Sequence, residues 1–120
     1  MLFRSIGIAL ARLLWTRGAL RILTLAASLT VSEWLRGHLF TGFPWNVYGY
    51  GLTEWLPLAQ SVSLVGLWGM TLLAVMIFSS PAVLIDEKAD NRRPWLAPVC
   101  AVIVLAAMAA FGLEIGRAHV

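Results

Sequence analysis

Three stretches of the 120-residue chain are apolar for long enough to cross a bilayer as helices. They cover residues 18–37, 57–80 and 95–113, and a helix needs about 20 mainly apolar residues to traverse the hydrocarbon core. The third stretch, WLAPVCAVIVLAAMAAFGL, contains no charged residue. Pro57 stands in the first turn of the second, a position where helices tolerate proline. The pattern therefore predicts three full membrane spans.

Residues 1–15 are also apolar, but Arg4 and Arg12 interrupt them. The stretch is too short to span comfortably, so we expect a partial helix, the truncated end of an earlier one. A signal peptide is the competing interpretation, because a basic start precedes an apolar run and the small residues at 26–28. The interruption of the apolar run and the two further spans downstream favour the helix.

Composition places the whole chain in the membrane class. Hydrophobic residues make up 60% and charged residues 12%, with a mean hydropathy of +0.82, values unusual for a soluble domain. The fold class expected is an all-α, multi-pass transmembrane helical bundle fragment, with three full spans plus one partial. No basic run resembles a nucleic-acid patch. One cysteine and two isolated histidines offer no metal site, and we expect no cofactor.

The basic residues predict an orientation, because cytoplasmic loops retain arginine and lysine. Arg12, Arg17 and Arg21 precede the first span, and the loop 85–94 carries Lys88, Arg92 and Arg93. These groups lie on one side after two crossings, so loop 85–94 is expected to be cytoplasmic. Loop 38–56 contains no lysine or arginine, which places it outside, and the third span then leaves the C-terminal end outside as well.

Glu33 and Arg36 stand three residues apart at the end of the first span. This spacing puts both on one face of a helix, where they can form an ion pair. Ionisable residues within a span indicate function by default, although long side chains near a helix end also reach the headgroup layer. A structural or lipid-headgroup role and direct support of an active site both stay open at this point.

The loop FTGFPWN follows that helix end. Gly42 permits backbone conformations closed to other residues, Phe43 precedes Pro44 and is therefore driven to an extended backbone, and Trp45 is typical of membrane interfaces. Asn46 offers hydrogen-bond donors. No residue here combines a nucleophile with a neighbouring base, which covalent catalysis needs. The loop is therefore expected to shape an interface rather than to perform chemistry.

Taken together, EWLRG at 33–37, FTGFPWN at 40–46 and the following GY at 49–50 resemble the signature of the apolipoprotein N-acyltransferase family. The resemblance covers nearly the whole chain and implies the membrane part of an enzyme of the bacterial inner membrane. It also implies acyl transfer from a membrane phospholipid to the free amino group of a diacylglyceryl-cysteine apolipoprotein. The motif positions assigned to a lipid entrance are Glu33, Arg36, Gly42, Phe43, Pro44, Trp45 and Asn46.

The family's Glu-Lys-Cys triad belongs to a nitrilase-like domain, so the resemblance implies no catalytic residue in this fragment and no activity of the fragment alone. Residues 114–120, EIGRAHV, break the apolar pattern and have the sequence that adapter read-through would encode; we treat them as a non-native tail and residues 1–113 as a partial transmembrane domain. Two alternatives come from other classes. One is a non-enzymatic membrane scaffold or anchor, and the other is a transporter subunit.

Overall fold

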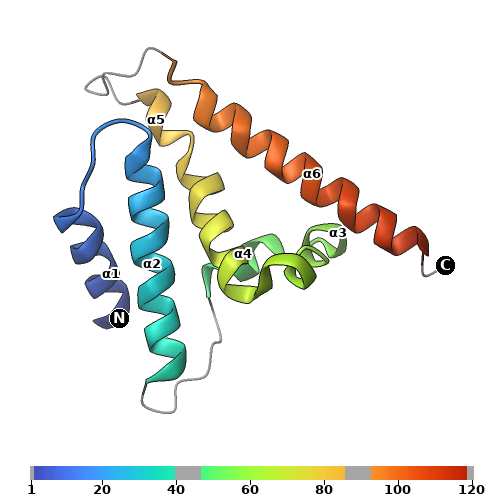
Figure 1. Ribbon diagram of the computed structural model, residues 1–120, viewed down its shortest axis with the longest axis horizontal. Coiled ribbons are helices and arrows are strands. Elements are labelled where there is room, and N and C mark those ends of the chain that lie inside the picture. The colour runs from blue at the N-terminus through green and yellow to red at the C-terminus, as the bar shows by residue number, and fades with distance from the viewer. Residues whose placement is uncertain (1, 40–46, 86–92, 119–120) are drawn as a thin grey trace.

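In a computed structural model, the chain is described over residues 2–39, 47–85 and 93–118, and every regular element of these ranges is a helix, which confirms the all-α class. The helices, in chain order, are α1 (Leu2–Leu13), α2 (Leu20–His38), the 3-10 helix η1 (Tyr48–Leu52), α3 (Leu56–Ala59), α4 (Val62–Ser79), α5 (Ala82–Ile85) and α6 (Leu96–Ala118). α1, α2 and the later part of α4 run side by side, while α6 slants away from them (Figure 1). The partial helix expected over 1–15 corresponds to α1.

α1 packs closely on α2 because small residues meet at their contact. Gly7 and Ala11 are the buried residues of α1. A Cβ added at Gly7 would lie 2.5 Å from Oγ of Ser32, a distance that no real Cβ tolerates, so only glycine allows this approach. Ser32 satisfies its own buried hydroxyl by donating to the carbonyl of Leu29 at 2.9 Å. The close contact brings the start of α1 beside the end of α2.

The segment expected as one straight span over 57–80 is broken. α3 ends at Ala59, and α4 contains a non-helical residue, Gly66, with φ 67° and ψ 175°. This region of backbone space is essentially restricted to glycine. Before Gly66 the chain runs crosswise toward α6, and after it α4 runs alongside α2 (Figure 1). The second span was expected over 57–80, and the helical stretch of membrane length in the structure is Val62–Ile85, with the kink at Gly66 inside it.

α6 is fixed at its C-terminal half, where it meets α3. Gly112 is buried against the backbone of Pro57, and a Cβ there would collide with the carbonyl group of Pro57. Met108 of α6 joins Leu52 and Met70 in a small apolar core between η1, α4 and α6. α6 continues to Ala118, five residues beyond the end expected at 113, because Glu114 to Ala118 contains no helix-breaking proline.

Two helical stretches of the described residues are long and apolar enough to cross a membrane by length and composition, namely Val62–Ile85 and Leu96–Ala118. α2 has the length expected for the first span, but it carries Arg21, Glu33 and Arg36 and buries a polar strip that includes Ser28 and Ser32. These residues lower its hydropathy, so the expected count of three full spans is not confirmed.

Candidate functional site

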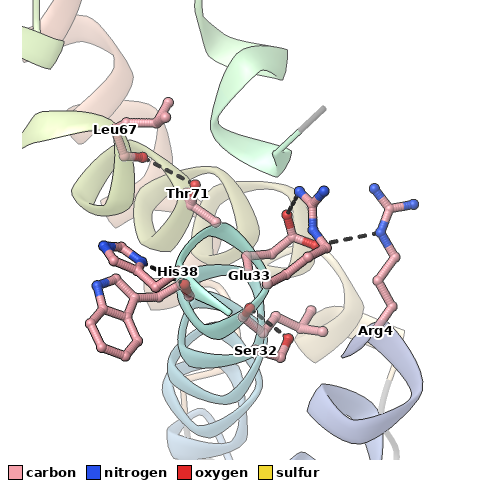
Figure 2. Close-up of polar contacts among 9 residues, drawn as sticks. Arg4, Ser32, Glu33, His38, Leu67 and Thr71 are labelled. Carbon is pink, nitrogen blue, oxygen red and sulfur yellow. Dashed lines mark hydrogen bonds and ion pairs between the residues drawn. The ribbon is translucent and has the colours of Figure 1, made fainter. Parts of the chain in front are cut away.

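The candidate site is a buried carboxylate between two arginines. Glu33, on α2, is fully buried at 0% exposure. Its Oε2 accepts a hydrogen bond from Nη2 of Arg36 at 2.7 Å, which confirms the ion pair expected from their spacing. Its Oε1 lies 3.5 Å from Nε of Arg4, on α1. Figure 2 shows Arg4 reaching Glu33 from α1. Both carboxylate oxygens therefore face a guanidinium group, as burial of a charge requires.

Arg4 is the part of this site that the sequence pattern did not indicate. In the sequence it only interrupts an apolar stretch, and 29 residues separate it from Glu33. The close approach at Gly7, one turn further along α1, brings it to the carboxylate. The available signal was the charge itself, because an arginine within an apolar helix usually pairs with another polar group.

The 3-10 helix η1 contributes a third contact to the site, through Tyr48. The guanidinium carbon of Arg4 lies 5.0 Å from the ring centroid of Tyr48, within cation–π range. The next residue, Gly49, rests on α4: a Cβ there would lie 2.9 Å from the backbone nitrogen of Thr71. Thr71 donates its hydroxyl to the carbonyl of Leu67. The site therefore ties together the start of α1, the end of α2, η1 and the middle of α4.

A separate aromatic cluster lies on the other side of the α2 end. The rings of Trp34 and His38 are stacked, with centroids 4.4 Å apart, and Trp68 of α4 lies 5.9 Å from His38. Nδ1 of His38 is 2.8 Å from the carbonyl oxygen of Trp34, so this nitrogen donates. Figure 2 shows His38 and Glu33 on opposite sides of α2. His38 is therefore an exposed side chain with its Nδ1 satisfied by the helix backbone.

Five of the seven motif positions, Gly42, Phe43, Pro44, Trp45 and Asn46, lie outside the described residues, as does most of loop 85–94. The structure therefore places Glu33 and Arg36 together and does not test the other five positions. Among the described residues, no group of three or more His, Cys, Asp or Glu side chains is arranged to hold a metal ion.

The chemistry available to this cluster is binding rather than bond making. Both oxygens of Glu33 already face arginine nitrogens, so the carboxylate is a poor general base. Two guanidinium groups face the one carboxylate of Glu33. Charge-assisted hydrogen bonds of this kind are stronger than neutral ones. The cluster therefore joins the start of α1 to the end of α2.

Comparison with known proteins identifies related sequences. The family described as "Apolipoprotein N-acyltransferase N-terminal domain" matches residues 1–80. Curated proteins named apolipoprotein N-acyltransferase match over 111 residues, 92% of the chain: those of Bradyrhizobium diazoefficiens at 64% identity, Rhodopseudomonas palustris at 65% and Agrobacterium fabrum at 47%. The chain spans about a fifth of the length of these relatives, 21%, 21% and 20% respectively. No solved structure matches the chain.

Proposed function

Because the chain belongs to the apolipoprotein N-acyltransferase family, we propose that it is the membrane portion of an enzyme that transfers a fatty acyl chain from phospholipid to lipoproteins. The acceptor is the N-terminal amino group of a diacylglyceryl-cysteine. The observation that carries this proposal is the family match over residues 1–80, which includes both EWLRG and TGFPW. The resemblance inferred from those motifs is thereby confirmed at the level of the family.

In this proposal the chain lies in the bacterial inner membrane with α2, the α4–α5 stretch and α6 as three crossings and α1 as a partial one. The turn between α1 and α2 lies at the same end of the molecule as α5 and the start of α6 (Figure 1). Arg12, Arg17 and Arg21 surround that turn, and Arg93 precedes α6. This grouping of basic residues supports a cytoplasmic assignment for that end. Residues 38–56 and the C-terminal end then lie outside.

The cluster around Glu33 is proposed to hold the outer end of α2 in place for a lipid entrance. Glu33 and Arg36 fix the helix end from which the loop 40–46 departs. Phe43, Pro44 and Trp45 are proposed to form a rigid wedge at the interface, and Gly42 and Asn46 belong to the same proposed entrance; all five lie outside the described residues. Arg36 is proposed to attract the phosphate of the phospholipid donor. The acyl-transfer step itself is assigned to a Glu-Lys-Cys triad outside this chain.

A chimera tests this function. Residues 1–113 replace the matching segment of the Bradyrhizobium diazoefficiens relative, and the purified chimera is incubated with phospholipid and a diacylglyceryl-cysteine peptide. We expect the peptide to gain the mass of one acyl chain, because the segments are 64% identical. Residues 1–113 alone serve as the control and should transfer nothing. A chimera that inserts into membranes in normal amounts but leaves the peptide amine free would contradict the proposal.

A further inference from the structure

The break at Gly66 divides the second apolar stretch into two parts with different directions. With φ 67° and ψ 175°, Gly66 occupies a conformation that other residues essentially do not adopt. The turn is therefore encoded by the sequence and is not a local irregularity of one helix. Before the break, α3 and the first turn of α4 run crosswise between α6 and the α2–α4 pair; after it, α4 follows α2 (Figure 1).

The part after the break is long enough to cross a membrane without the part before it. At about 1.5 Å per residue, the part of α4 after the break, residues 67–79, measures roughly 20 Å. Beyond a turn at residues 80–81, α5 adds about 6 Å to the same apolar stretch, against a hydrocarbon thickness of about 30 Å. Residues 55–65 are therefore not needed for the crossing. Because residues 55–65 run crosswise, they widen the helical bundle and do not lengthen the second membrane crossing.

This crosswise part exposes large apolar side chains. Leu56 and Leu64 are 69% and 66% exposed, and Trp55 and Val65 are also exposed. In the same segment the hydroxyl of Ser63 donates a hydrogen bond to the backbone carbonyl of Gln60 at 2.7 Å. Tryptophan is enriched at membrane–water interfaces, and short segments with one apolar edge lie in that plane.

The crosswise part, residues 55–65, also packs against the two helices of membrane length. Pro57 of α3 touches Gly112 of α6, and Leu58 and Val62 pack against the core around Met70 and Met108. These contacts hold the segment against both helices that have membrane length. Trp55, Leu56, Leu64 and Val65 stay exposed beside these contacts.

We propose that residues 55–65, the surface segment, lie in the plane of the membrane with Trp55, Leu56, Leu64 and Val65 inserted among the lipid headgroups and upper acyl chains. The partner is the lipid surface itself, and the membrane crossing begins at Gly66. This moves the start of the second span about nine residues beyond the position expected from the sequence. The proposal does not depend on the chain acting in acyl transfer.

Depth measurements on spin-labelled cysteines test the surface segment. Single cysteines replace Leu56, Leu64 or Leu73 in a Cys100→Ala background and carry the spin label. The variants are placed in phosphatidylglycerol–phosphatidylethanolamine vesicles. Relaxation of each label by oxygen, compared with relaxation by a water-soluble nickel complex, gives its depth in the membrane. Val102, 65% exposed on α6, is labelled as a lipid-facing reference. We expect positions 56 and 64 to lie at similar shallow depths, about 5–10 Å below the headgroups, and position 73 to lie deeper.

A continuous span gives a different result. Positions 56 and 64 would then differ in depth by about 12 Å, the rise of eight helical residues, and this outcome overturns the proposal. The proposal would also be overturned if the nickel complex relaxed both labels strongly and oxygen did not, because the segment would then be exposed to water. Where a leucine variant does not insert, Ser63→Cys and Val65→Cys report on the same segment by the same measurement.

Discussion

Replacing Arg36 by alanine is expected to lower the free energy of unfolding by about 3 kcal/mol. The change removes the 2.7 Å hydrogen bond to a carboxylate that is fully buried. Only the longer 3.5 Å contact to Arg4 then compensates the charge of Glu33. Thermal unfolding in detergent micelles measures the effect. Arg17→Ala is the matched control, because Arg17 is exposed, and its effect should stay within about 0.5 kcal/mol.

A second substitution shows whether the buried charge is the cause. Adding Glu33→Gln to Arg36→Ala removes the carboxylate that has lost its closest cation, so the double variant should regain about half of the lost stability. Coupling of this kind is expected only between residues that interact directly. If the double variant is as unstable as Arg36→Ala or less stable, the carboxylate is not the source of the loss.

Gly112→Ala is expected to destabilise the packing of α6 by about 2–3 kcal/mol. The added Cβ would meet the backbone of Pro57, which cannot move aside as a flexible side chain would, so α6 must shift away from α3. The same unfolding measurement detects the change. Ala110→Val adds more volume to an exposed position of the same helix and should be nearly neutral. Equal effects of the two substitutions would mean that the contact with α3 contributes little.

Local patterns in the sequence predicted the helices and one half of the ion cluster. Long apolar stretches require helices in a bilayer because backbone groups must be satisfied internally, and the three-residue spacing of Glu33 and Arg36 suffices to pair them. Arg4 could not be found in this way. Its position depends on the packing of α1 against α2 at Gly7, which is a property of two elements together.

The break at Gly66 was missed for a related reason. Glycines in apolar helices commonly allow close packing, and Gly66 and Gly69 stand three residues apart within the apolar stretch 57–80, so their presence there does not indicate a break. In the structure Gly66 has a positive φ and nothing within 4 Å of an added Cβ, whereas at Gly69 a Cβ would crowd Val65. The two glycines look alike in the sequence, and only the anchoring of α3 on α6 separates their roles.

The end of α2 and the loop after it are proposed to form the lipid entrance of an N-acyltransferase. Turnover of the chimera carrying Trp45→Ala or Arg36→Ala, measured at matched membrane abundance, tests it most directly. The control is Trp15→Ala, an exposed tryptophan in the turn before α2. Both entrance variants are expected to lose roughly 10- to 100-fold in turnover, because misplaced substrate reacts slowly, while the control keeps full activity. Unchanged turnover in both Trp45→Ala and Arg36→Ala would contradict the proposal and leave these residues a structural role only.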